Sequence, residues 1–144
     1  MLKLRRTSSA RWNGPASTGQ GTIAVGSRGI QLPFSLKARV GEDPASNPEE
    51  LLGAAHAGCF AMSLANECEN NGTPAQSLSA SATVHLVETD QGFRIPTVNL
   101  RVRGSVAGVT PDEFARLAAR AEAGCPVSRL FNAEITVEAQ LEDG

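Results

Sequence analysis

One long segment, residues 47–70, constrains the fold more than any other part of the chain. Asn47 is a good N-cap and Pro48 suits the first position of a helix, while the stop signals NNGTP follow at about Asn70. Between these ends, the run GAAHAGCFAMSLA is almost wholly small or apolar. A helix that is apolar on most sides must be buried on most sides. We therefore expect a central helix that packs closely against a second helix, or against its own copy in a dimer.

The other predicted elements are strands and one more helix. Strands are indicated by the runs SARW, GTIAV, IQLPFSL and AEITVEAQL and by the alternation of residues 77–90 and 93–107, which the turn DQG joins into a hairpin. Thr110 begins the second helix with a capping box, Gly124 ends it, and CPVSRLF follows as a short helical turn. We predict an α+β fold with mostly antiparallel sheets and buried helices, in a single domain over residues 1–144.

Composition and charge exclude several classes of function. The 144 residues suit one domain, and an apolar fraction of 41% with a charged fraction of 19% is ordinary for a globular protein. The net charge of −2 argues against a nucleic-acid partner, which favours a dense basic patch. No apolar run approaches the roughly 20 residues that span a bilayer, and no apolar region follows Arg5 and Arg6 as an export signal requires. We expect a cytoplasmic protein with no membrane partner.

The cysteines indicate free thiols. Three cysteines do not make a secreted disulfide scaffold, and without a CxxC pair neither a structural zinc site nor a thioredoxin-type motif is expected. Cys59 lies in the middle of the long helix, where it is either a small buried hydrophobe or a reactive thiol that needs a nearby cation, for which Arg39 is the candidate. Cys125 follows Gly124 and precedes Pro126, so it lies at a junction where its thiol can approach another element.

Cys68 and the two histidines are interpreted mainly as structural residues. Cys68 follows Cys59 by nine residues, half a turn out of phase on the helix, so it does not serve the same site. His56 precedes Cys59 by about one turn, and three interpretations stay open: a Cys–His nucleophile pair, part of a metal site, or a packed or dimer-contact residue. His85 alternates out of the apolar face of its strand and is expected to be exposed.

Three runs together, NPEELLGAAHAGCF, AGCPVS and AEITV, resemble the OsmC/Ohr family of thiol-dependent hydroperoxide peroxidases, and more closely its osmotically inducible OsmC branch. The resemblance extends from SARWNG near the start to the closing AEITVEAQL. It implies that Cys59 is the peroxidatic cysteine and Cys125 the resolving cysteine. It also implies that Arg39 holds the thiolate and that Glu49 pairs with this arginine.

The resemblance further implies an OsmC-like fold in an intertwined homodimer, with two central helices backed by sheets from both chains. The spacing of Glu49 and Cys59 agrees with a site between two copies. These residues lie ten positions apart in one helix, about 15 Å along its axis. One copy therefore hardly presents both groups to a single arginine, whereas two antiparallel copies do.

The implied function is the reduction of organic hydroperoxides, and more weakly of hydrogen peroxide, as an antioxidant defence against oxidative and osmotic stress. Cys59 forms a sulfenic acid, Cys125 condenses with it to a disulfide, and an external dithiol restores both thiols, with no metal, flavin or nucleotide. Candidate lining residues for an apolar substrate pocket are Phe34, Leu36, Phe60, Met62 and Leu64, and the alternative for each of them is a plain core residue. Two other functions fit the same cysteines: a thiol–disulfide oxidoreductase, and a non-enzymatic, stress-induced dimer with an apolar binding cleft.

Overall fold

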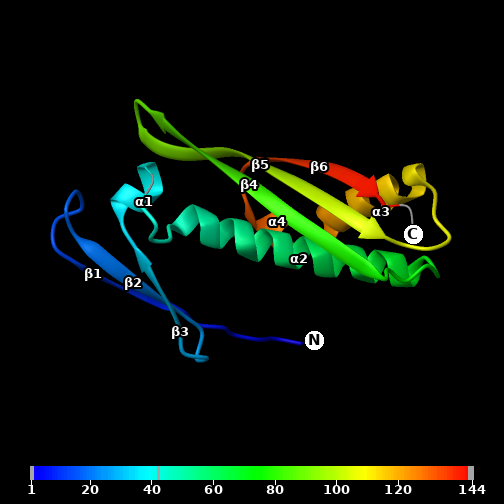
Figure 1. The fold of residues 1–144 in the computed structure, drawn as a ribbon, viewed down its shortest axis with the longest axis horizontal. Coiled ribbons are helices and arrows are strands. Elements are labelled where there is room, and N and C mark those ends of the chain that lie inside the picture. Colours follow the sequence, from blue (N-terminus) through cyan, green and yellow to red (C-terminus); the bar gives the residue numbers. More distant parts are fainter. Residues whose placement is uncertain (1, 42, 143–144) are drawn as a thin grey trace. The chain divides into compact units, whose positions relative to one another are not determined.

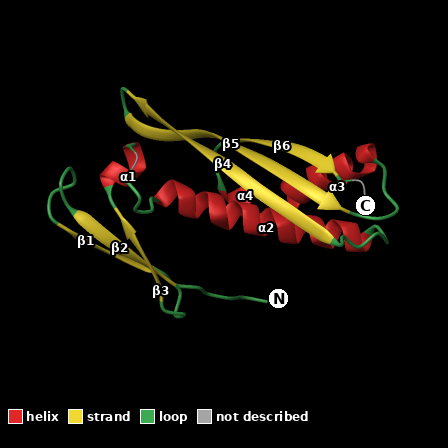
Figure 2. Cartoon of the chain, viewed as in Figure 1, coloured by secondary structure: helices red, strands yellow, loops and turns green. Residues whose placement is uncertain are grey.

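The computed structural model describes residues 2–41 and 43–142 and has the predicted α+β architecture, in which the described residues form helices and two three-stranded sheets (Figures 1 and 2). Internal contacts divide the chain into two compact units, residues 1–51 and residues 52–144. That the whole chain folds as one domain stays a prediction. Within the described residues, no helix is both long enough and apolar enough to cross a bilayer.

The first unit is an antiparallel sheet followed by a short helix. Its strands, in sheet order, are β1 (Ser9–Asn13), β2 (Gln20–Val25) and β3 (Ile30–Phe34). All three strands predicted near the N-terminus are confirmed. Strand β3 ends before Ser35, which is the N-cap of a helix of five residues, α1 (Leu36–Val40). The Ser35 hydroxyl accepts a 3.0 Å hydrogen bond from the Ala38 N–H. Helix α1 carries Arg39 and is too short for a helical period to reveal it in the sequence.

The second unit holds most of the long elements. In chain order they are α2 (Pro48–Asn70), which begins in the first unit, β4 (Ser77–Thr89), β5 (Gly92–Ser105), α3 (Pro111–Gly124), α4 (Pro126–Leu130) and β6 (Glu134–Leu141). The predicted hairpin is confirmed because β4 and β5 pair antiparallel, and β6 adds to β5 in parallel. Helix α3 starts at the predicted capping box of Thr110 and Glu113. Helix α2 runs unbroken between its predicted cap and stop.

The core of this unit lies between the β4–β5–β6 sheet and the helices. Strand β5 turns inward the alternate residues Val98, Leu100 and Val102, which have almost no exposed surface. Phe114 of α3 belongs to the same core cluster as Leu100 and Val102 and lies over Gly104, where a Cβ atom would be 2.5 Å from the Phe114 ring. Glycine at this position therefore allows α3 to approach the strand closely.

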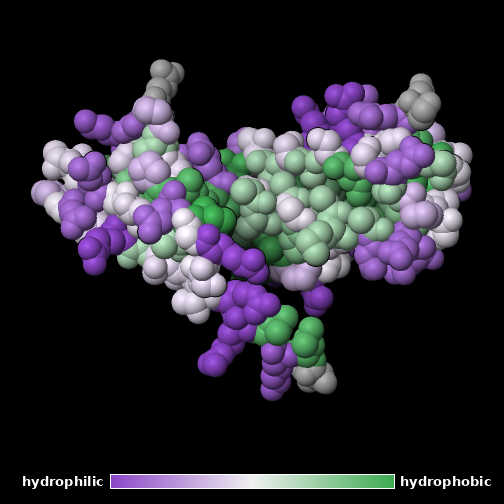
Figure 3. All heavy atoms as spheres, turned by 60° about the horizontal axis from the view of Figure 1, so that its bottom comes forward, coloured by the Kyte–Doolittle hydropathy of each residue, from purple (hydrophilic) through white to green (hydrophobic). Residues whose placement is uncertain are grey.

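Helix α2 buries only one of its faces within this chain. The buried face consists of Gly53, His56, Phe60, Leu64 and Cys68, which recur every three or four residues. The opposite face is exposed, and its small or apolar members are Ala54, Ala55, Gly58, Met62 and Ala65. Figure 3 brings the lower side of Figure 1 forward and shows a broad apolar area there. One chain alone does not bury the helix on most sides, and contact with a second copy stays a prediction.

Candidate active site

Two cysteines that lie 66 positions apart in the sequence meet in the second unit. The Sγ atoms of Cys59 and Cys125 are 3.2 Å apart, and both thiols are free. Cys59 is partly exposed in the middle of α2, whereas Cys125 has no exposed surface. A reagent that arrives from solvent therefore reaches Cys59 first. The sulfurs need to approach by only about 1.2 Å to reach the roughly 2.05 Å of a disulfide bond.

Cys125 occupies the junction that its neighbours in the sequence predict. It is the C-cap of α3 and the N-cap of α4, with an extended backbone (φ −67°, ψ 121°), and Pro126 takes the first turn of α4. The backbone N–H of Val127 acts to lower the pKa of both thiols, and the N–H of Ser128 acts to lower that of Cys125. The first turn of α4 therefore surrounds the sulfur pair with donors.

The surroundings of the two thiols act on their pKa values differently. Burial raises the pKa of Cys59, and the hydrogen bond from the Val127 N–H does not cancel this effect. Burial also acts to raise the pKa of Cys125, but the N–H of Ser128, the Cys59 thiol and the Ser128 hydroxyl outweigh it and lower that pKa. The two thiols lie close enough for the ionisation of one to affect the pKa of the other. Cys59 therefore needs a cation from elsewhere to become a thiolate at neutral pH.

Cys68 and His85 lie apart from this pair, as expected. Cys68 is fully buried in the hydrophobic core, where burial raises the pKa of its thiol. His85 is exposed on the sheet and hydrogen-bonds to Asn99. In the part of the chain that the structure describes, no three His, Cys, Asp or Glu side chains gather as a metal site requires.

In the first unit, Arg39 and Glu49 form the ion pair that the family resemblance implies. Arg39 Nε and Nη2 both donate to Oε1 of Glu49, at 2.9 and 2.7 Å. Glu49 is only 8% exposed, and its Oε2 has no hydrogen-bond partner among the described residues. Two bonds to one buried oxygen fix the plane of the guanidinium.

Asn47 joins the two helices that carry this ion pair. Its Nδ2 donates to the Ala38 carbonyl oxygen of α1 at 3.0 Å, and its Oδ1 accepts from the Glu50 N–H of α2 at 2.9 Å. The second bond is the predicted N-cap, whereas the first is not evident from the sequence. A single buried amide thus sets the spacing between the backbone of Arg39 and that of Glu49.

An open hollow of about 170 Å³ lies beside Arg39 in the first unit. The larger side chains around it are those of Trp12, Phe34, Leu36 and Pro48. Phe34 and Leu36 therefore line an apolar hollow, as the sequence suggests. Among the candidates on α2, Phe60 and Leu64 have no exposed surface and belong to the core, while Met62 is 75% exposed. Phe60 and Leu64 therefore show the alternative role, plain core packing, because residues four positions apart share the buried face of the helix.

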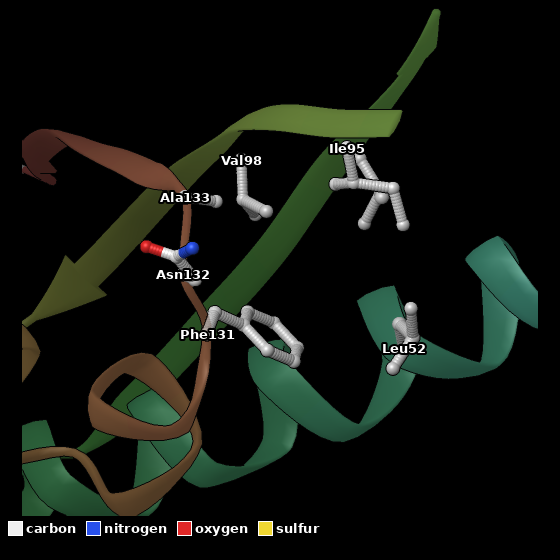
Figure 4. Close-up of a pocket in the computed structure, with 7 residues that line it drawn as sticks. Leu52, Ile95, Val98, Phe131, Asn132 and Ala133 are labelled. Atoms are coloured by element: carbon white, nitrogen blue, oxygen red, sulfur yellow. The ribbon is translucent and has the colours of Figure 1, made fainter. Parts of the chain in front are cut away.

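His56 is buried against the segment that carries Cys125. Its Nε2 lies 2.6 Å from Ser128 Oγ, and its ring meets the Phe131 ring edge-on at a centroid distance of 5.1 Å. The Phe131 ring also forms a wall of an apolar pocket of about 180 Å³ (Figure 4). Other walls of this pocket are Leu52, Val84, Ile95 and Val98. Of the three interpretations of His56, the structure shows the packed residue, and its partner Ser128, 72 positions away, has no distinguishing signal in the sequence.

The chain is similar to proteins of one family along almost its whole length. The family described as OsmC-like protein matches residues 41–140. Peroxiredoxin OsmC of Escherichia coli (strain K12) is 35% identical over 98% of this chain and 99% of that protein. Organic hydroperoxide resistance protein OhrA of Bacillus subtilis (strain 168) is 28% identical over 79% of each. The crystal structure of an organic hydroperoxide resistance protein OsmC from Legionella pneumophila has the same fold, with a TM-score of 0.69 and 23% identity over 98% of this chain and 100% of that chain.

Proposed function

The chain belongs to the family of OsmC-like proteins, and from that premise we propose that it is a cysteine-based peroxidase that reduces organic hydroperoxides and, more weakly, hydrogen peroxide. The names of two relatives, a peroxiredoxin and an organic hydroperoxide resistance protein, support a peroxidase-type enzyme. The contact between the Cys59 and Cys125 sulfurs, at 3.2 Å, carries the proposal. An accessible thiol backed by a buried second thiol is the arrangement that a peroxidase needs to finish its cycle with a disulfide.

In the proposed reaction, the Cys59 thiolate attacks an oxygen of the hydroperoxide. The O–O bond breaks, the sulfur becomes a sulfenic acid, and the alkoxide takes up a proton and leaves as an alcohol, or as water when the substrate is hydrogen peroxide. Cys125 then loses its proton and attacks the Cys59 sulfur, which releases water and forms the disulfide. A dithiol reduces this disulfide and is itself oxidised. We place this cycle in the cytoplasm, where cysteines are kept reduced.

A cation beside Cys59 is part of the proposal, because burial raises the pKa of that thiol. We assign this cation to Arg39, whose guanidinium is held by two bonds to Glu49. A fixed guanidinium keeps its charge and its N–H donors in one place. It therefore stabilises the thiolate by both charge and hydrogen bonding.

The proposed site forms between two antiparallel copies of the chain. Glu49 and Cys59 lie on one unbroken helix, ten positions and so about 15 Å apart along its axis. An ion pair at the start of one α2 is therefore suited to a thiolate in the middle of the partner helix. The exposed apolar face of α2, where Met62 is 75% exposed, offers a surface for the second copy.

A mixing experiment tests whether two copies share the site. Chains with Arg39→Ala and chains with Cys59→Ser are each expected to be inactive. When they are unfolded and refolded together, mixed dimers contain one site with an intact Arg39–Glu49 pair from one chain and Cys59 from the other, so part of the activity returns. A mixture that stays inactive, although mixed dimers are detected by mass spectrometry, contradicts a shared site.

The preference for organic substrates follows from the hollow beside Arg39. Its apolar walls, Phe34 and Leu36 among them, offer burial to an alkyl or aryl group, worth about 25 cal/mol for each Å² removed from water. Hydrogen peroxide gains nothing from this burial. Leu36→Ser should therefore lower kcat/KM for cumene hydroperoxide and leave kcat/KM for hydrogen peroxide unchanged. Equal losses for both substrates argue against this assignment.

Stopped-flow consumption of cumene hydroperoxide in the presence of dithiothreitol tests the proposed function itself. Wild-type chain should turn over, Cys59→Ser should not, and Cys68→Ser, the matched loss of a thiol outside the site, should behave as wild type. Unchanged consumption by Cys59→Ser rejects the mechanism. Absence of turnover at every dithiol supply favours the non-enzymatic dimer.

A thiol–disulfide oxidoreductase is the second candidate, because the same contact between Cys59 and Cys125 serves it. In that case the Cys59–Cys125 disulfide passes to a substrate dithiol, or the reduced pair attacks a substrate disulfide, and no peroxide is consumed. Rates with an organic disulfide and with cumene hydroperoxide, measured on the same preparation, separate the two. A faster reaction with the disulfide selects the second candidate.

A further inference from the structure

We propose that His56 is a positioning residue for Cys125: its ring holds the Ser128 hydroxyl so that this hydroxyl donates its hydrogen bond to the Cys125 sulfur. The inference rests on the proposed function, because it describes how the resolving thiol of that reaction is prepared. It is drawn from a buried titratable side chain that the mechanism above does not use.

The geometry around His56 permits one arrangement of its ring. The side chain has no exposed surface, and Ser128 is only 5% exposed. The 2.6 Å contact between Nε2 and Ser128 Oγ links α2 to α4. On the same ring, Phe131 packs edge-on at an interplanar angle of 88°. A ring held on both sides cannot turn without breaking the bond to Ser128.

The direction of the hydrogen bond follows from the other ring nitrogen. Nδ1 of His56 is buried and has no hydrogen-bond partner among the described residues. Burial lowers the pKa of His56, so the ring is neutral and carries one N–H. Buried N–H donors without an acceptor are rarer in proteins than buried acceptors without a donor. The proton therefore resides on Nε2, and His56 donates to Ser128 Oγ.

A serine hydroxyl that accepts from His56 is free to donate its own proton elsewhere. Ser128 lies in the first turn of α4, which follows the Cys125 cap, and its side chain acts to lower the pKa of the Cys125 thiol. The hydroxyl proton is therefore available to this sulfur. The opposite tautomer of His56 would take the hydroxyl proton for itself, and Ser128 would then accept from the Cys125 thiol. The first arrangement stabilises the thiolate of Cys125, whereas the second stabilises its thiol.

This orientation assists two steps of the proposed reaction. When Cys125 resolves the sulfenic acid, it loses its proton, its sulfur bonds to the Cys59 sulfur, the S–O bond breaks, and water leaves. When a dithiol later attacks Cys59, the S–S bond breaks and Cys125 departs as a thiolate. In both steps negative charge forms on the Cys125 sulfur, and the Ser128 hydroxyl stabilises it. His56 exchanges no proton in either step.

The test measures the ionisation of Cys125 directly. A chain with Cys59→Ser and Cys68→Ser retains Cys125 as its only thiol, and the sequence contains no tyrosine whose ionisation would overlap. The ultraviolet absorbance of the thiolate, followed against pH, then gives the Cys125 midpoint without requiring a reagent to enter the buried site. Only acid or base is added during this titration.

Three substitutions in this background give distinct expectations. Ser128→Ala should raise the midpoint by about one pH unit, a tenfold loss of thiolate, because a hydrogen bond to a charged group is removed. His56→Leu should raise it by a similar amount, and Ser128→Ala should then add no further shift. His56→Gln, whose amide N–H can still donate to Ser128, should stay close to the starting midpoint. Leu117→Ala, which removes core packing without removing a hydrogen bond, is the control for destabilisation and should not move the midpoint.

Two results overturn the inference. One is a midpoint that stays fixed, or falls, in His56→Leu. The other is a shift in His56→Gln as large as that in His56→Leu, while thermal unfolding shows that both variants are folded.

Single-turnover oxidation separates this inference from the proposed function. After one equivalent of cumene hydroperoxide, His56→Leu in the otherwise native chain should form the sulfenic acid at the wild-type rate and the disulfide about tenfold more slowly. If the wild-type chain forms no Cys59–Cys125 disulfide while the midpoints shift as expected, the proposed function fails and the positioning role of His56 stands. If the wild-type chain forms the disulfide and His56→Leu forms it equally fast, the positioning role fails alone.

Discussion

Oxidation of the Cys59–Cys125 pair should stabilise the chain against unfolding by about 4 kcal/mol. The bond would close a loop between residues 66 positions apart. According to chain-entropy theory, closing a loop of this length lowers the entropy of the unfolded chain by about 15 cal/mol/K, which corresponds to about 4 kcal/mol at 25 °C. Because the two sulfurs already lie 3.2 Å apart, little strain in the folded state offsets this gain.

Urea denaturation checks the magnitude. The chain is reduced with a dithiol, or oxidised with one equivalent of cumene hydroperoxide, and both forms are unfolded at the same protein concentration. With a urea dependence of about 2 kcal/mol/M, the oxidised form should unfold at about 2 M more urea. Cys125→Ser is the control and should show the same midpoint after both treatments. One cooperative transition would also support a single domain over residues 1–144, whereas two would indicate that the two units unfold separately.

A gain below about 1 kcal/mol would refute the reasoning. A disulfide that forms without strain should raise the free energy of unfolding by most of the entropy that it removes from the unfolded chain. The same free energy appears in the redox equilibrium. By linkage, the disulfide should be reduced at a potential about 90 mV lower than the same pair in the unfolded chain. Equilibration with glutathione buffers, with and without denaturant, measures this difference independently of unfolding curves.

Four further predictions concern single residues. Asn47→Ala removes the cap of α2 and the bond to α1 and should cost about 2–3 kcal/mol in urea denaturation, whereas Asn47→Ser keeps the cap and should cost less; equal costs contradict the bridging role. Arg39→Ala should raise the pH midpoint of Cys59 alkylation, and a curve identical to wild type removes Arg39 from the site. Cys125→Ser should react once at the normal rate and then stall or over-oxidise, so sustained turnover argues against a resolving role. Burial raises the pKa of the Cys68 thiol above its ordinary value of 9.0. The neutral buried thiol therefore makes its full contribution to the free energy of unfolding below pH 9.0, and this contribution is lost as the pH rises past the raised pKa. Cys68→Ala should reduce this alkaline loss, measured as the urea midpoint against pH.

The ends of α2 and the β4–β5 hairpin are predictable because neighbours a few positions away determine them. Asn47 and Pro48 start the helix through local hydrogen bonding and backbone preference, and alternation of side chains sets the inward face of each strand. The parallel pairing of β6 with β5 has no such local cause. It depends on how α3 and α4 carry the chain across the core, which no short run of residues encodes.

The candidate site also combines residues that the sequence identifies with contacts that only the folded chain shows. Residue types and the family resemblance identify Cys59 and Cys125, but their contact joins positions 66 apart and needs the folded chain. The hydrogen bond from Asn47 to the Ala38 carbonyl oxygen joins positions nine apart, and the bond between Ser128 and His56 joins positions 72 apart. The sequence does not decide whether Phe60 lines a pocket or packs in the core, because a helix apolar on most sides does not reveal which side is covered.

The β4–β5 hairpin extends beyond its third strand, since β6 pairs with β5 only from Thr97 to Gly104 (Figure 1). Past that point the hairpin is a two-stranded ribbon, with a register shift between His85 and Val87. Two-stranded ribbons are at best marginally stable in water, so amide hydrogens in this ribbon should exchange with solvent before those in the middle of β5. We expect this ribbon to open before the three-stranded part of its sheet, and its strand edges, which are unpaired among the described residues, are then available for pairing with another chain.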